Sequence, residues 1–164
     1  VEVSGPFSHF AGYRRIIALL DGNGMALSFD RAPQVIIDRP HEPFAFDGGW
    51  RTDCRLLDGP VRDFNLIVDD RRMQASLEFR AQSLDTEIGE TALLHAIRGR
   101  WRADGDECGC TLAPGDTLRV EKPGALSLTA LDADAVLALA HLVRRRIIPD
   151  DDGGTNLTSR RDAP

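Results

Sequence analysis

The chain has 164 residues, 42% of them apolar, which is enough to bury the core of one domain or of two small subdomains. Its formal net charge of -6 leaves no surplus of cations to neutralise phosphates, so nucleic acid is not expected as a partner. No apolar run approaches the roughly 20 residues that span a bilayer, so no membrane partner is expected either.

The ends and the cysteines bear on where the protein works. The first residues lack the basic and apolar regions of a signal peptide, and the three cysteines, an odd number, fit a reducing compartment. We therefore expect a cytoplasmic protein. Because the chain starts at Val1 rather than Met, we also expect it to begin inside a longer open reading frame.

Short strand-forming runs, separated by Gly, Pro and Asp, fill the first half of the chain. The predicted strands are 15–20, 25–29, 35–38, 43–46, 54–57 and 61–68. The sequence Asp21-Gly22-Asn23-Gly24 predicts a tight hairpin, because Gly and Asn tolerate the positive φ that such turns need. Many short strands at close spacing favour a β-sandwich or barrel.

The second half has a similar pattern, with predicted strands at 75–80, 92–103, 117–121 and 125–131. Residues 19–22 loosely parallel 96–99, and 58–68 parallel 132–143, which suggests two similar β-units in tandem. We place these units at 1–72 and 73–148, and expect the polar residues 149–164 to be a disordered tail. Residues 133–146 suit either a helix, by their Ala and Leu content, or a closing strand.

The stretch 58–68 carries two residues that strands normally avoid. Because strand side chains alternate, Asp63 and Asn65 share one face with Ile67, while Phe64 lies on the other face with the apolar residues 66 and 68. The polar pair either points into a barrel cavity, where it can hydrogen-bond a ligand, or faces water on a half-buried sheet. The pattern by itself favours the second interpretation.

Arg15 opens an otherwise apolar strand, where a guanidinium could reach over the end of a barrel. Since Arg binds carboxylates through two parallel hydrogen bonds, Arg15 with Asn65 would form a site for a small organic acid. The alternative is that Arg15 extends into solvent from the strand end. No metal or other cofactor is expected, because Cys108 and Cys110 are too close for a zinc knuckle and the four histidines are scattered.

Four segments, in this order and spacing, resemble the HutD/Ves family. They are Gly5-Pro6-Phe7-Ser8-His9-Phe10-Ala11-Gly12-Tyr13-Arg14-Arg15, Leu20-Asp21-Gly22-Asn23-Gly24, Pro43-Phe44-Ala45-Phe46-Asp47-Gly48 and Leu57-Asp58-Gly59-Pro60-Val61-Arg62-Asp63-Phe64-Asn65. The resemblance covers roughly the first 70 residues by motif, and the rest by general layout. The chain lacks the Trp-Lys-Asn-Gly-Gly-Gly segment with which the family normally starts, and it has Ala11 where Pro is usual and Arg14 where Asp is frequent.

The resemblance implies an all-β, cupin-like protein of two barrels in tandem (a bicupin), without the usual cupin metal ligands and with its N-terminal strands missing. It implies a non-catalytic regulator of bacterial histidine utilisation that binds urocanate or a formylated glutamate. Carried over by motif, the ligand-binding residues are Phe7, Ser8, Arg15, Asp63 and Asn65.

Two further functions stay open, as does a homodimer. One is a metal-independent cupin enzyme acting on a histidine-pathway intermediate, with Asp63 or a histidine as general acid-base and Arg15 anchoring the substrate. The other is a module that binds a protein partner through barrel edges and the aromatic segment 7–10.

Overall fold

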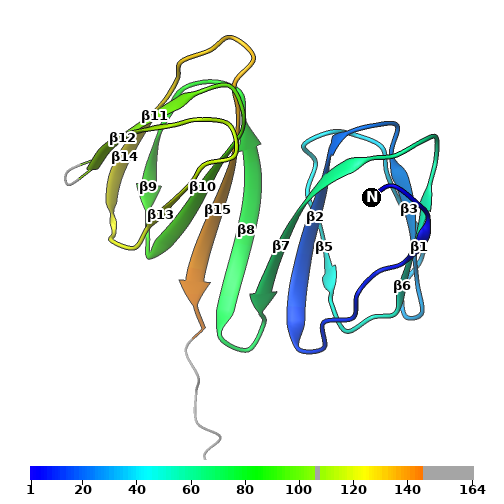
Figure 1. Cartoon of the computed structure of the whole chain (residues 1–164). Helices are drawn as coiled ribbons and strands as arrows, with labels where there is room; N and C mark the ends of the chain where they lie inside the picture. The colour runs from blue at the N-terminus through cyan, green and yellow to red at the C-terminus, as the bar shows by residue number, and fades with distance from the viewer. Residues whose placement is uncertain (106–107, 146–164) are drawn as a thin grey trace, which may run out of the picture.

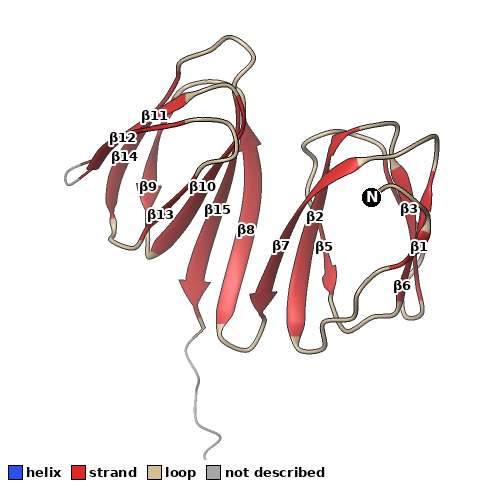
Figure 2. Cartoon of the chain, in the orientation of Figure 1, coloured by secondary structure: helices blue, strands red, loops and turns tan. Residues whose placement is uncertain are grey.

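The computed structural model describes residues 1–105 and 108–145. Within these ranges the chain forms fifteen β-strands and no helix, so the all-β prediction is confirmed. Figures 1 and 2 show the strands gathered in two halves that lie side by side, β1–β7 in one and β8–β15 in the other. In the described part of the chain, no helix has the length and apolarity to cross a membrane.

The first half consists of two antiparallel sheets with the strand orders β1-β6-β3-β4 and β5-β2-β7. Its strands are β1 (Gly5–Pro6), β2 (Tyr13–Asp21), β3 (Met25–Phe29), β4 (Val35–Ile37), β5 (Phe44–Asp47), β6 (Thr52–Leu56) and β7 (Arg62–Asp69). The predicted hairpin joins β2 to β3, and Gly22 and Gly24 both have φ near +100° in it. Only glycine suits the turn, since a Cβ on Gly22 would lie 2.7 Å from the carbonyl oxygen of Pro60.

The second half also has two antiparallel sheets, with the orders β13-β10-β15-β8 and β12-β11-β14-β9. Its strands are β8 (Met73–Arg80), β9 (Leu84–Ile88), β10 (Thr91–Arg98), β11 (Trp101–Gly105), β12 (Cys108–Leu112), β13 (Thr117–Val120), β14 (Gly124–Ala130) and β15 (Val136–Arg144). The predicted boundary after residue 72 thus falls between β7 and β8. The assignment of each half as a cupin-like unit stays a prediction, and the expected tail lies outside the described residues.

The two halves repeat the same strand pairings, offset by eight strands. The order β5-β2-β7 corresponds to β13-β10-β15, and β1-β6-β3-β4 corresponds to β9-β14-β11-β12. The register also shifts at matching places, between Leu19 and Asp21 in β2 and between Ala96 and Arg98 in β10. Gly22 follows the shift in β2 and Gly99 follows the shift in β10, and both glycines have a positive φ. Residues can therefore be matched between the halves by their pairing.

Two differences from the sequence-based expectations have clear causes, and one open alternative is decided. The single strand expected at 92–103 is wrong, because Gly99, with φ of +62°, turns the chain between β10 and β11. Strands β9 and β12 were not predicted: charged residues interrupt the first, and the second contains Gly109 between two cysteines. Of the two alternatives for 133–146, the strand is observed, as β15 from Val136 to Arg144, and Arg146 lies outside the described residues. β15 suited a helix because it is buried on both faces, between β10 and β8, and so does not alternate.

Apolar side chains form one cluster inside each half and a third between the halves. Ile17, Leu19 and Met25 belong to the first interior, and Leu94 and Leu139 to the second. The cluster between the halves comprises Ile16, Leu77, Ala138 and Ala140, with Phe64, Leu66, Ala75, Phe79, Leu93 and Ile97 packed against it. The sheet β5-β2-β7 is therefore covered on both faces, and this arrangement determines the surroundings of Arg15.

Candidate functional site

Arg15 lies inside the first half, although it carries a charge. It is the third residue of β2 and alternates with Ile16, so it points to the same side as Ile17 and Leu19, away from the second half. Only 6% of its surface is exposed, so the alternative in which Arg15 extends into solvent is wrong. A buried cation of this kind needs compensating partners.

The partners of the Arg15 guanidinium are one amide, one carbonyl and three aromatic rings. Nη2 donates to Oδ1 of Asn65 at 2.8 Å, and Nη1 donates to the Ser8 carbonyl oxygen at a long 3.4 Å. Cζ lies 4.9 Å from the ring centroid of Phe7, 5.6 Å from that of Phe10 and 5.1 Å from that of Phe46. Such ring faces attract a desolvated cation.

The guanidinium is not saturated by these contacts. Nε of Arg15 is buried and has no hydrogen-bond partner within the described residues. Burial lowers the pKa of Arg15, and the negative charge of Asp63 partly offsets that effect. Arginine still stays protonated at neutral pH, so the site presents a fixed positive charge with a donor to spare.

Asn65 links Arg15 to a carboxylate. Its Nδ2 donates to Oδ2 of Asp63, while its Oδ1 accepts from Arg15. The side chain of Asp63 is 12% exposed, and Asn65 is exposed. The cluster therefore runs from a buried cation to the solvent along one face of β7. Beneath it, burial raises the pKa of the Cys54 thiol and the charge of Asp63 raises it further, which favours an uncharged Cys54.

The predicted alternation along β7 is confirmed. Asn65 faces Arg15, while Phe64 and Leu66 pack in the cluster between the halves. Both interpretations of the polar face of β7 hold in part. Asn65 is open to water, and its side chain also hydrogen-bonds the buried cation inside the first half.

All five residues named from the sequence lie in or against this cluster. Phe7 contributes its ring, Ser8 its backbone carbonyl rather than its hydroxyl, and Arg15, Asp63 and Asn65 their polar side chains. Sequence reasoning missed Phe10 and Phe46. Phe10 lies in an irregular segment without a period, and Phe46 reaches the site because it pairs with Arg15 across β2 and β5, which local sequence does not show. Among the residues that the structure describes, no three His, Cys, Asp or Glu side chains converge as metal ligands.

Comparison with known proteins supports the resemblance seen in the sequence. A family model described as HutD matches residues 1–138. An uncharacterised 21.2 kDa protein in the hutC 3′ region of Pseudomonas putida is 47% identical over 97 residues, which are 58% of this chain and 50% of that protein. The matched part thus spans about half the length of this curated relative.

Solved structures share the fold. A conserved protein of unknown function from Pseudomonas aeruginosa PAO1, PA5104, superposes with a TM-score of 0.79 at 36% identity, over 88% of this chain and 79% of that one. HutD from Pseudomonas fluorescens SBW25 (formate condition) gives a TM-score of 0.74 at 32% identity, over 88% and 76%. A cupin 2 conserved barrel domain protein from Leptotrichia buccalis, 9% identical, gives a TM-score of 0.50 over 87% and 80%, and this likeness concerns the cupin-like fold alone.

Proposed function

The chain belongs to the HutD family, which is linked to the histidine-utilisation locus, and we propose on that basis that it is a cytoplasmic regulatory protein that binds a small organic acid without catalysing its conversion. Urocanate and formylated glutamate are the candidate acids. The binding residues are Arg15 and Asn65, with Phe7, Ser8 and Asp63 around them.

The buried guanidinium of Arg15 is the observation that carries this proposal. Placing a charge inside an apolar interior is unfavourable unless the surroundings compensate for it, and here one strong hydrogen bond and three rings do so incompletely. A carboxylate is the ligand that complements such a group, because its two oxygens match the donor geometry of a guanidinium. The unused Nε and the long bond from Nη1 to Ser8 leave two donors for it.

The surroundings favour a small, flat acid. The rings of Phe7 and Phe46 lie against the guanidinium, so a planar ligand such as urocanate could stack where a bulky one would clash. Formate, present in the condition of the Pseudomonas fluorescens HutD structure, has the same carboxylate and is a minimal probe of the same chemistry. Asn65 is exposed, and the second N–H of its Nδ2, which donates once to Asp63, is available for the ligand's second polar group.

The test is isothermal titration of urocanate, with formate and acetate as simpler carboxylates. Arg15→Met should weaken urocanate binding at least about tenfold, since a hydrogen bond to a charged group contributes about 1.5–3 kcal/mol. Arg14→Met is the matched control, because Arg14 is the preceding residue of β2, is exposed, and points to the other face. It should leave the affinity unchanged.

Two results would contradict the proposal. If no carboxylate binds at millimolar concentration, or if both Met variants bind as the parent does, the buried cation is not a binding group. Turnover of urocanate by the pure protein, abolished in Asp63→Asn, would instead support the enzyme that the sequence left open.

A further inference from the structure

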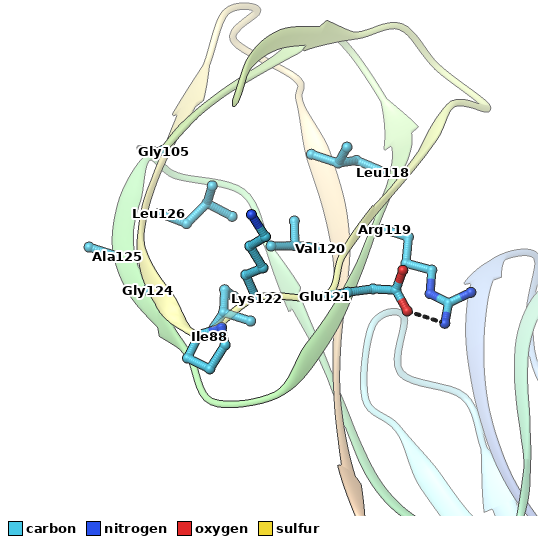
Figure 3. Close-up of a pocket in the computed structure, with 11 residues that line it drawn as sticks. Ile88, Gly105, Leu118, Arg119, Val120, Glu121, Lys122, Gly124, Ala125 and Leu126 are labelled. Atoms are coloured by element: carbon cyan, nitrogen blue, oxygen red, sulfur yellow. Dashed lines mark hydrogen bonds and ion pairs between the residues drawn. The ribbon is translucent and has the colours of Figure 1, made fainter. Parts of the chain in front are cut away.

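A pocket opens in the second half of the chain, away from Arg15. Its volume is about 380 Å³, within the range of small-molecule sites. Figure 3 shows Leu118, Val120 and Leu126 pointing into it, with Lys122 extending its ammonium group between the last two. Ile88 closes one side, and Ile88 and Leu126 are almost fully buried.

Strand pairing places this pocket beside the positions that match the Arg15 site, with Val120 common to both. Arg15 lies four residues before the register shift at Leu19, and Ala92 lies four residues before the matching shift at Ala96. Arg15 pairs with Phe46 in β5, and Ala92 pairs with Val120 in β13. The small Ala92 thus stands where the first half has its buried cation.

The pocket is hollow because aromatic side chains are missing at the matching positions. In the first half the ring of Phe29 lies 5.3 Å from that of Phe46 and 6.0 Å from that of Phe44, so the three rings pack against one another. By strand pairing, Phe29 corresponds to Gly105, Phe46 to Val120 and Phe44 to Leu118. No aromatic side chain occurs among the described residues that line the pocket.

The polar groups of the first site are also replaced. Asn65 pairs with Ile17, and Asp63 pairs with Leu19. In the second half, Leu139 takes the position of Asn65 and Leu137 takes the position of Asp63. Lys122 points inward from the rim, whereas Arg119 and Glu121, which pair with each other at 2.6 Å, point away from Val120 (Figure 3). An ammonium has three donors, so Lys122 can bind an anion in addition to its contacts within the chain.

We propose that this pocket binds a medium-chain aliphatic carboxylate, with the hydrocarbon chain against Leu118, Val120 and Leu126 and the carboxylate on Lys122. The described side chains that point into the pocket are aliphatic apart from Lys122, which suits a methylene chain (Figure 3). One cation at the rim then fixes the orientation of the ligand. The two halves would bind acids of different character, a flat polar one and an aliphatic one, and the second site does not depend on the first.

Octanoate is the probe, titrated into the whole chain by isothermal calorimetry, with octan-1-ol as its uncharged analogue. Val120→Phe restores the ring that the first half has at this position and should abolish binding of both. Lys122→Gln should weaken octanoate about three- to fivefold, the effect of an exposed ion pair, and leave octan-1-ol unchanged. Arg119→Gln is the matched control and should change neither. Saturating formate should not displace octanoate.

Three outcomes would overturn the assignment. Octanoate fails to bind the unmodified chain, folded Val120→Phe binds it as tightly as before, or Lys122→Gln and Arg119→Gln weaken it equally. If Val120→Phe does not fold, the comparison of the Lys122 and Arg119 variants decides the question by itself.

Discussion

Replacing Arg15 with Met separates a binding role from a structural one. The change removes the hydrogen bond to Asn65, which contributes about 1.5–3 kcal/mol, and the contacts with three rings, which contribute about 1–2 kcal/mol together. It also removes the unfavourable desolvation of a guanidinium that is 6% exposed, which amounts to several kcal/mol. A methionine side chain has nearly the volume of the aliphatic part of an arginine side chain, and it fills irregular space well.

The opposing effects nearly cancel, so we expect the free energy of unfolding of Arg15→Met to lie within about 1 kcal/mol of the parent. Arg15→Ala leaves a cavity beside the three aromatic rings and should lower the free energy of unfolding by about 2–4 kcal/mol. Urea unfolding followed by tryptophan fluorescence measures both, because Trp50 packs beside Phe29 in the first half and Trp101 is buried in the second. A loss of more than about 2 kcal/mol in Arg15→Met would refute the reasoning and make Arg15 a structural residue.

Three further predictions concern other parts of the chain. Trp101 is fully buried, and its Nε1 has no hydrogen-bond partner in the described residues. Trp101→Phe should therefore change the free energy of unfolding by less than about 1.5 kcal/mol, and Trp101→Ala should lower it by about 3–5 kcal/mol. Urea titration measures both. Hydrogen bonds from Arg100 lower the pKa of Asp132 from 3.8 to about 2. A carboxyl with a depressed folded pKa stabilises above its unfolded pKa, so this contribution should be lost as pH falls from about 4 to about 2, and Asp132→Asn should flatten that part of a pH series of unfolding curves. A Cβ on Gly99 would lie 2.7 Å from backbone, so Gly99→Ala should lower the melting temperature more than Gly59→Ala, which meets only strain from its positive φ; equal losses would contradict this.

Much of the fold could be predicted because each short strand carries its own signal. β3 begins and ends at the predicted residues, Met25 and Phe29, since a glycine turn precedes it. β15 could not be settled, because burial on both faces removes the alternation that distinguishes a strand from a helix. Likewise, the turn at Gly99 lies within a run whose composition otherwise favours one long strand.

Five residues of the cluster around Arg15 were named from the sequence, but their environment was not. Alternation places Asp63 and Asn65 on one face of β7, and the family motifs add Phe7 and Arg15. The burial of Arg15 follows from the strands and aromatic rings that pack around it inside the first half, and pairing between distant strands is not visible in local sequence. The pocket in the second half was missed for a related reason, because the absence of aromatic side chains at the matching positions leaves no motif.

The claim that Arg15 binds an organic acid can be tested most directly at its Nε atom. In a protein labelled with ¹⁵N-arginine, the Nε–Hε resonance of Arg15, assigned by its loss in Arg15→Lys, reports this donor alone. We predict that urocanate shifts this resonance, with saturation at the affinity that calorimetry gives, because the free Nε gains a carboxylate acceptor. If urocanate binds but the Arg15 resonance stays unchanged while others move, the buried guanidinium is not the binding group and the central claim is wrong.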